Sequence, residues 1–270
     1  MKKWLRFPVL VLFAALVAGA ALAQEVSFKD PTGDDKGPGS YVYPTDKVYK
    51  AGSFDLTEFK LKVSGDKATF SVSVGSALED PWGMGGGFAT QMVFVFIDTD
   101  GKEGSGFTKG LPGLNVAFAP ADAWDRCVIL SPQPQQRVLS EVETKAAWAK
   151  SAVLVPMRTR GAGRTISGTV SLKELGAGDP TKWGYQVVMQ SNEGFPDKAD
   201  LLTRKVNEFE GQHRFGGGTD GDCDPHVMDI LAGKGTGDAS EVEEKKKALA
   251  YECDADGTPK KVATLPMVRK

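Results

Sequence analysis

Four aspartates near the start of the chain have the residue type and spacing of a calcium site. Asp30, Asp34 and Asp35 stand among glycines, and Asp55 follows further along. Calcium takes roughly six to eight oxygen ligands, and glycine lets main-chain carbonyls turn inward to join the carboxylates. The alternative is an ordinary set of turns, because Asp and Gly are common turn formers. We predict that these four aspartates hold a structural calcium ion.

Two further acidic motifs carry only part of a calcium-binding loop. Residues 98–101 and 254–257 each have the Asp-x-Asp-Gly opening of an EF-hand. The twelfth position, which needs a glutamate, is Lys109 in the first motif and Leu265 in the second, so neither is an EF-hand. Alternating aspartates in residues 220–224 could also chelate a cation.

Tryptophans in loops are candidates for sugar binding, because a flat aromatic face can pack against the C–H side of a pyranose ring. Trp82 lies between proline and glycine in a Gly-rich loop, where an indole is hard to bury, and Trp124 flanks a strand-like run. The alternative for both is core packing, since aromatic residues dominate sandwich interiors. We predict that Trp82 and Trp124 bind carbohydrate.

The sequence offers little material for catalysis. Its two histidines are His213 and His226, so a Ser-His-Asp or Cys-His site would need one of them. A glycosidase needs only two carboxylates at a suitable separation. The carboxylates here occur in turn-forming loops without groove-building segments between them. We therefore expect a non-catalytic protein.

The start of the chain has the features of a secretory signal over residues 1–23. A basic start in residues 1–6 precedes an apolar run in residues 7–20, and residues 21–23 supply the small-x-small pattern for cleavage before Gln24. The apolar run is short for a bilayer span and no stop-transfer segment follows it. We expect a secreted, periplasmic or cell-surface protein without a membrane span after cleavage.

The three cysteines fit an oxidising compartment. Cys223 and Cys253 lie in one C-terminal region and each is followed by Asp, so we predict a disulfide between them. The alternative is a free or intermolecular thiol. Cys127 stands inside a strand-like run and is predicted to be a buried apolar residue.

Strands must position most of these residues. Short apolar runs rich in β-branched and aromatic residues are separated by turn residues, in a chain with 32 Gly and 15 Pro. This pattern predicts an all-β fold, an antiparallel β-sandwich with long loops. The runs are residues 68–74, 92–97, 115–118, 126–130, 164–170 and 185–189.

Helix is scarce in the sequence. Residues 171–175 predict a single turn, and residues 240–249 are the only longer candidate, with Ser240 as N-cap and Glu243 at the capping-box spacing. Since no repeat or low-complexity linker divides the chain, we predict one domain over residues 24–270, with a C-terminal extension that packs back on it.

The charge of the chain is close to balanced. It has 33 Lys and Arg against 35 Asp and Glu, for a formal net charge of −2. The basic residues form no stripe or patch along the sequence. This composition argues against a nucleic-acid partner.

A series of short motifs runs through the chain in order. They are residues 30–45, 54–56, 80–83, 96–100, 111–115, 123–125 and 183–186, followed by 224–230 and 265–268. The series resembles the C-terminal module of glucodextranase, which also occurs in some pullulanases. That module is similar to family 9 carbohydrate-binding modules and to DOMON-like sandwich domains. The resemblance implies a β-sandwich accessory module for polysaccharide binding or surface attachment, and it does not imply glucodextran hydrolysis.

Two functions from different classes follow from these expectations. The first is a carbohydrate-binding module that recognises a polysaccharide or cell-wall glycan. The second is a structural envelope protein, associated with a surface layer, that uses the same sandwich for assembly with other envelope proteins. The exposure of Trp82 and Trp124 together, and a groove rather than a flat apolar patch, would favour the first.

Overall fold

The computed structural model describes residues 24–193, 202, 204–219 and 223–270. The predicted signal segment, residues 1–23, lies outside the described residues, as do Asp220 and Asp222. Within the described ranges, no helix is long and apolar enough to cross a bilayer.

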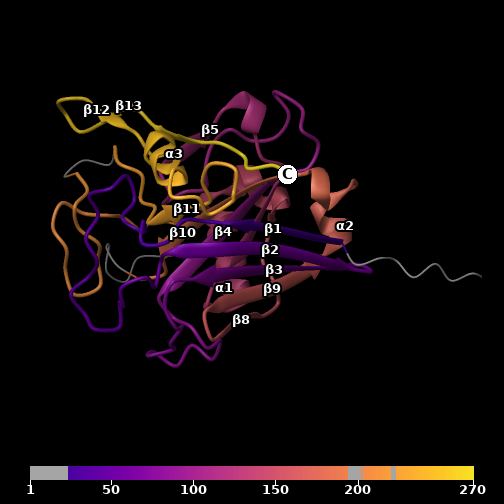
Figure 1. Cartoon of the computed structure of the whole chain (residues 1–270), viewed down its shortest axis with the longest axis horizontal. Helices are drawn as coiled ribbons and strands as arrows, with labels where there is room; N and C mark the ends of the chain where they lie inside the picture. The colour runs from indigo at the N-terminus through magenta and orange to yellow at the C-terminus, as the bar shows by residue number, and fades with distance from the viewer. Residues whose placement is uncertain (1–23, 194–201, 203, 220–222) are drawn as a thin grey trace, which may run out of the picture.

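Two five-stranded sheets dominate the part of the chain that the structure describes (Figure 1). The first has the order β1 (Gln24–Lys29), β2 (Leu56–Ser64), β3 (Lys67–Val74), β9 (Thr165–Ser171) and β8 (Thr159–Ala162), all antiparallel. The second has the order β11 (Asp229–Ile230), β10 (Gly184–Ser191), β4 (Gln91–Asp98), β6 (Arg126–Leu130) and β7 (Val153–Leu154), antiparallel except for β6 and β7. The predicted β-sandwich is confirmed.

The main core lies between the two sheets. Alternate residues of β3 point inward, among them Phe70 and Val72, and they share one buried cluster with Val93, Val95 and Ile97 of β4. This is the period-two pattern expected of a strand with one covered face. Burial of each such side chain contributes roughly 1.5–3 kcal/mol to folding.

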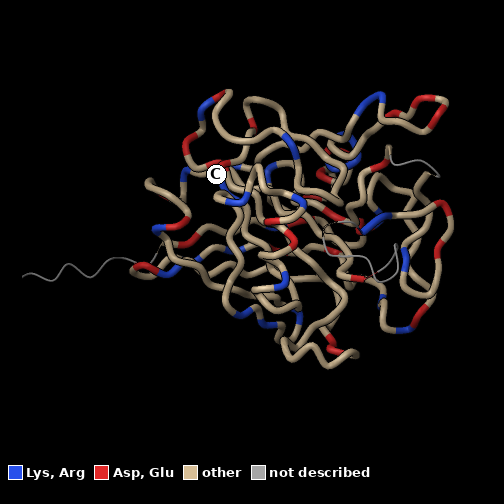
Figure 2. The backbone as a smooth tube through the Cα atoms, turned by 180° about the vertical axis from the view of Figure 1, so that it is seen from behind, with Lys and Arg blue, Asp and Glu red and all other residues tan. Residues whose placement is uncertain are grey.

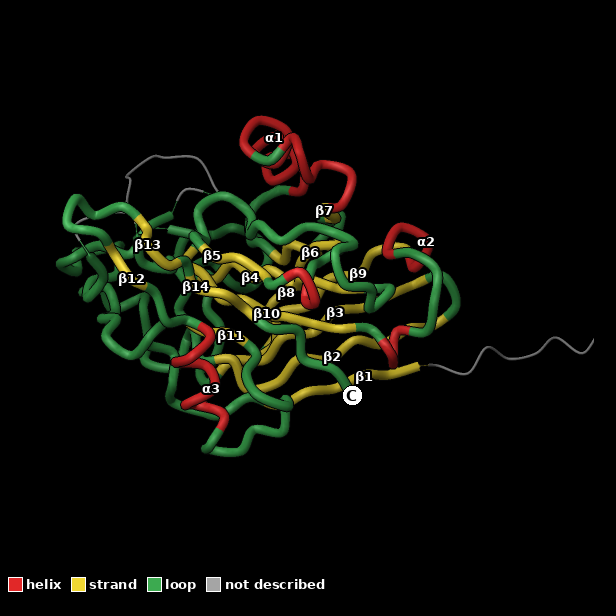
Figure 3. The backbone as a smooth tube through the Cα atoms, turned by 90° about the horizontal axis from the view of Figure 1, so that it is seen from above, coloured by secondary structure: helices red, strands yellow, loops and turns green. Residues whose placement is uncertain are grey.

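A second core covers the outer face of the second sheet. Every residue of β4 is buried, and Phe94 and Phe96 belong to a cluster that includes Val138 and Val142 of helix α1 (Gln135–Lys145). Figure 3 shows α1 standing outside the sheets. The sequence analysis missed this helix, because only these two positions of its eleven residues are fully buried and its sequence is otherwise polar apart from the partly buried Leu139.

The two predicted helical segments form, with one difference. Helix α2 (Leu172–Leu175) is the predicted single turn, closed by a capping box between Ser171 and Glu174. Helix α3 (Glu241–Ala248) also forms, but its predicted capping box is wrong, since the Ser240 hydroxyl donates to Asp238 Oδ1 at 2.7 Å instead. Three short 3₁₀ segments complete the helical elements of the described chain: η1 (Pro120–Asp122), η2 (Ala147–Ala152) and η3 (Pro180–Lys182).

The C-terminal segment packs back on the sandwich, as expected. Strand β14 (Ala263–Leu265) pairs in parallel with β5 (Val116–Phe118). Val268 then exchanges main-chain hydrogen bonds with Tyr185 of β10. The Lys270 ammonium lies 4.7 Å from the ring centroid of Phe28 on β1. The last residues therefore contact both sheets.

The predicted disulfide is confirmed. Cys223 is joined to Cys253, with Cα atoms 5.6 Å apart, and Cys253 ends β12 (Glu252–Cys253), which pairs with β13 (Pro259–Lys261). Cys127 is a free, fully buried cysteine, as predicted. The bridge closes a loop with a sequence separation of 30 residues.

Replacing Cys223 and Cys253 together with serine should destabilise the protein by about 3 kcal/mol, because the unfolded chain regains the entropy of the open loop. Urea unfolding of the double variant measures this loss. Dithiothreitol added to the unaltered protein should lower the urea midpoint of unfolding about as far as the double substitution does. An unchanged midpoint in the reductant would show that the bridge does not stabilise the folded state.

Candidate functional site

The structure brings two of the four predicted calcium ligands together. Asp30 follows β1 directly, Asp34 lies in the next loop, and Asp229 begins β11. One carboxylate oxygen from each lies within 4.8 Å of the others. We call these three residues the acidic site. Asp229 was missed because it stands in an apolar run, where the sequence shows no turn-forming pattern around it.

The other two predicted ligands have different partners. The carboxylate of Asp35 accepts a hydrogen bond from the Tyr43 hydroxyl. Asp55 Oδ1 accepts from the main-chain N–H of Gly33 at 2.8 Å, so Asp55 helps to hold the loop that carries Asp34. Neither Asp35 nor Asp55 is therefore one of the three grouped carboxylates in this structure.

A buried ammonium group stands inside the acidic site. Lys245 of α3 places its Nζ 3.0 Å from Asp34 Oδ2 and 3.1 Å from Asp229 Oδ1, and its side chain is only 2% exposed. Burial by itself lowers the pKa of Lys245, but Asp229 and Asp34 outweigh burial and raise it. Lys245 is therefore a permanent positive charge at this position.

One ammonium does not balance three carboxylates. Asp30 Oδ1 accepts from the Ala232 N–H at 2.9 Å, whereas Asp30 Oδ2 is buried without a hydrogen-bond partner. Burial and the neighbouring Asp229 raise the pKa of Asp30 to about 10. Without a cation the site therefore holds a proton at neutral pH. A divalent cation could displace this proton, and an all-oxygen donor set suits calcium. The residues present therefore fit a calcium ion.

A second acidic group accepts hydrogen bonds from main-chain N–H groups of the turn after β4. It consists of Asp98, Asp100 and Asp125. Asp98 Oδ1 accepts from the N–H of Gly101 at 2.8 Å, and its Oδ2 pairs with Arg269 at 2.6 Å. Asp125 Oδ2 accepts from Thr99, and Asp100 accepts from Lys102 and Ser105. These carboxylates already have protein hydrogen-bond partners.

The two predicted sugar-binding tryptophans lie in different clusters. Trp82 is half-buried beside Tyr49 and His213, with ring centroids 6.4 and 5.9 Å away. Trp124 is fully buried, and its Nε1 donates to the Lys109 carbonyl at 3.0 Å. A buried indole offers no face to a sugar, so the structure does not support a binding role for Trp124. The role of Trp82 stays a prediction.

An exposed aromatic side chain lies outside Trp124. Trp148 in η2 is 40% exposed and packs against Phe107 and Trp124, with centroid distances of 5.4 and 6.1 Å. The ammonium of Lys109 lies 5.9 Å from the Trp148 ring centroid. Trp148 is therefore a partly exposed aromatic side chain that packs on the partly buried Phe107 and the buried Trp124.

Lys109 also lines an open cavity of about 610 Å³ on the same side of the molecule. This volume falls within the range of small-molecule sites, roughly 300–1,000 Å³. The walls come from residues around β5, from the C-terminal segment and from the region before His226. The lining residues are Thr108, Lys109, Gly110, Leu111, Pro112, Gly113, Asn115, Val116, Ala117, Leu202, Lys205, His226 and Val262.

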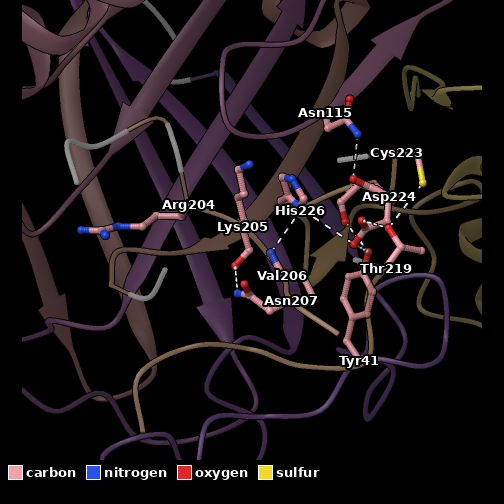
Figure 4. A network of polar contacts seen from close by, with 12 residues as sticks. Tyr41, Asn115, Arg204, Lys205, Val206, Asn207, Thr219, Cys223, Asp224 and His226 are labelled. Atoms are coloured by element: carbon pink, nitrogen blue, oxygen red, sulfur yellow. Dashed lines mark hydrogen bonds and ion pairs between the residues drawn. The ribbon is translucent and has the colours of Figure 1, made fainter. Parts of the chain in front are cut away.

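A polar network holds one wall of this cavity (Figure 4). Asn115 Nδ2 donates to the Asp224 carbonyl at 2.8 Å, and the Tyr41 hydroxyl donates to Asp224 Oδ2 at 3.2 Å. His226 Nδ1 accepts from the Val206 N–H at 3.2 Å. In a Ser-His-Asp triad this nitrogen donates to the carboxylate. His226 Nδ1 is an acceptor here, so this network does not have the hydrogen-bond polarity of such a triad.

The described chain is thus a β-sandwich with an open cavity and a polar network along one wall of it. The family model for the C-terminal binding module of glucodextranase, described as SLH-like, matches residues 26–268, and the chain belongs to this family. The resemblance seen in the ordered motifs is thus confirmed over nearly the whole described chain. A comparison with curated proteins found no match.

Proposed function

We propose that the protein is a secreted, calcium-stabilised binding module that recognises a polysaccharide or cell-envelope glycan. The open cavity carries this proposal, because it is a concave, largely apolar surface with polar groups in its wall, and its lining residue Lys109 also contacts the partly exposed Trp148. Membership of a binding-module family and the Cys223–Cys253 bridge support it. An assembly role in the envelope is the competing outcome of the tests.

A glycan-retention panel tests the binding role. Soluble mature protein is passed over α-glucan, xylan, cellulose and purified cell wall, and retention is compared for the unaltered protein, Trp148→Ala and Trp82→Ala. We expect retention on one polymer that falls at least about tenfold in Trp148→Ala. Loss only in Trp82→Ala would place the glycan at the Tyr49 cluster. Retention on none of the polymers would favour envelope assembly.

The acidic site should make the protein's stability depend on calcium. At calcium about a hundredfold above the dissociation constant, the gain is about 2.7 kcal/mol over protein in chelator. Asp30→Asn should remove most of this gain, because it takes one charge from the site with little change in shape. Melting curves with calcium and with EDTA measure the difference.

The matched control for Asp30→Asn is Asp100→Asn, which removes a charge from the acidic group whose oxygens already have protein partners. The Asp100→Asn variant should be stabilised by calcium as much as the unaltered protein is. If the unaltered protein melts at the same temperature in calcium and in EDTA, the calcium proposal is wrong.

A further inference from the structure

The outer face of the first sheet carries hydroxyl side chains. Along β3 and β9 buried residues alternate with exposed or partly exposed ones, so every second side chain lies on this face. Apart from one lysine, the side chains of these two strands on the outer face are all Ser or Thr. They are Lys67, Thr69, Ser71 and Ser73 of β3 and Thr165, Ser167, Thr169 and Ser171 of β9.

Some of these hydroxyls pair across the two strands. The Oγ1 atoms of Thr69 and Thr169 lie 2.9 Å apart, and so do Ser73 Oγ and Thr165 Oγ1. A hydroxyl group has one hydrogen and two acceptor lone pairs, so a pair that shares one hydrogen bond keeps a second hydrogen for another partner. The face therefore offers both donors and acceptors to a hydroxylated ligand.

Two arginines border the hydroxyls at the edge of the sheet. Arg160 of β8 is the register partner of Ser167 on β9. Arg160 and Arg158 are both exposed and line one open hollow of about 350 Å³. The lining residues are Met157, Arg158, Arg160, Ser167, Gly168 and Thr169. The hollow therefore joins two guanidinium groups to the hydroxyl face.

This part of the sheet has an excess of positive charge. Residues 67–74 and 155–171, which include β3, β8 and β9, contain one lysine, three arginines and no Asp or Glu. Among the described residues, no ion pair or side-chain hydrogen bond involves the guanidinium of Arg158 or Arg160. Over the backbone as a whole the two signs of charge are interspersed (Figure 2). The arginines are therefore a local departure from a mixed surface.

The carboxylates that border this region do not cancel its charge. Asp66 Oδ2 accepts from the Ser171 hydroxyl at 3.0 Å, and Glu174 Oε2 accepts from the Ser171 N–H at 3.3 Å. Both line a different hollow together with Lys67. Four cations against these two carboxylates still leave a net positive charge, and it lies with the arginines.

The composition of the face indicates the kind of partner. The buried core of a protein–protein interface is apolar and rich in aromatic residues, whereas the outer positions of β3 and β9 carry no apolar side chain. Beside the arginines, Met157 supplies one exposed apolar side chain. A polysaccharide offers hydroxyls to Ser and Thr, and an acidic one also offers carboxylates, which match the planar fork of a guanidinium.

We propose that the outer face of β3, β9 and β8 binds a carboxylate-bearing polysaccharide chain, with Arg158 and Arg160 as the groups that bind its carboxylates. The chain lies on the Ser and Thr hydroxyls, and the guanidinium groups donate charge-assisted hydrogen bonds at the edge of the sheet. This surface shares no lining residue with the open cavity of the proposed function. The inference therefore goes beyond that function, and neither site needs the other.

Calorimetry with a short oligogalacturonate tests this surface. A neutral malto-oligosaccharide and a poly-glutamate peptide with the same number of carboxylates are the comparison probes. We expect oligogalacturonate to bind at least about tenfold more tightly than either of them. The double variant Arg158→Gln, Arg160→Gln should lower this affinity by at least about tenfold. High salt should also weaken the binding, because exposed charges are screened.

Arg214→Gln is the matched control, because Arg214 is also exposed but follows His213 in a loop outside the sheets. It should leave the affinity for oligogalacturonate unchanged. An equal loss in Arg214→Gln would show a non-specific charge effect and overturn the proposal. Equal binding of poly-glutamate would overturn it in favour of an acidic protein partner, and tighter binding of a sulfated glucan would overturn the assignment to carboxylates.

Trp148→Ala distinguishes this surface from the open cavity. It should leave the binding of oligogalacturonate unchanged, and the double arginine variant should keep any glycan retention that depends on Trp148. If oligogalacturonate binding is lost in Trp148→Ala and kept in the double arginine variant, the glycan lies in the cavity, so this inference is wrong and the proposed function stands. No binding of oligogalacturonate would overturn this inference alone, since the retention panel tests the proposed function separately.

Discussion

Lys245→Met should destabilise the calcium-free protein by about 3–5 kcal/mol at about pH 8, the range found when one partner of a buried ion pair is removed. The variant keeps an unbranched side chain, one atom shorter, but leaves Asp34 and Asp229 without the ammonium that lies 3.0 and 3.1 Å away. Buried carboxylates cannot recover this loss from water. Urea unfolding in EDTA measures it.

The loss of stability in Lys245→Met should be smaller at about pH 5. Burial raises the pKa of Asp30 and of Asp229, so the folded state binds more protons than the unfolded state and its stability falls as the pH rises toward these values. At the lower pH, protons can neutralise the carboxylates that Lys245 no longer pairs with. Calcium should likewise restore part of the stability, and its affinity should rise because the site has lost a competing cation.

Lys246→Met is the control for this experiment. Lys246 is the next residue of α3 and pairs with Glu243 at the surface, where both side chains are largely exposed. Exposed pairs of this kind contribute little to stability. If the two variants unfold at the same urea concentration, Lys245 does not compensate the acidic site.

Trp124→Ala should cost about 3–5 kcal/mol, as for other large-to-small substitutions of buried aromatic residues. The indole is fully buried against Phe96 and Phe107, with ring centroids at 5.2 and 4.8 Å, and it donates to the Lys109 carbonyl. Its removal leaves a cavity and an unpaired carbonyl beneath the segment that carries Lys109. Urea unfolding of the variant measures the effect.

The comparison with Trp148→Ala separates core packing from ligand binding. Trp148 is partly exposed, so its loss should reduce glycan retention with a much smaller change in stability. A Trp124→Ala protein that unfolds like the unaltered one, yet no longer retains glycan, would restore the binding role that the sequence suggested for Trp124.

The strands could be predicted because their signal is local. Strand β6 has the bounds of the apolar run in residues 126–130, and the run in residues 68–74 lies within β3. Helix α1 escaped prediction because its buried stripe has only Val138 and Val142, and the second core that it covers is visible only once the sheet is folded.

The acidic site could be predicted only in part, for a related reason. Asp30 and Asp34 share one Gly-rich loop, so their proximity follows from sequence distance. Asp229 and Lys245 arrive from about two hundred residues further along, through the pairing of β11 and the packing of α3, and no local pattern predicts such contacts. Trp124 lies in a turn-rich segment, but Phe107 and Trp148 cover it after folding.

The contacts of the last residues have a consequence for how the chain folds. Val268 pairs with β10, and Lys270 lies over Phe28 of β1, so the final stretch joins segments that are far apart in the sequence. Contacts of such long range make folding slow, because the entropy of closing large loops is lost before the contacts form. These contacts therefore form late in folding, and a chain that lacks residues 263–270 would leave sheet surface exposed to proteases and to aggregation.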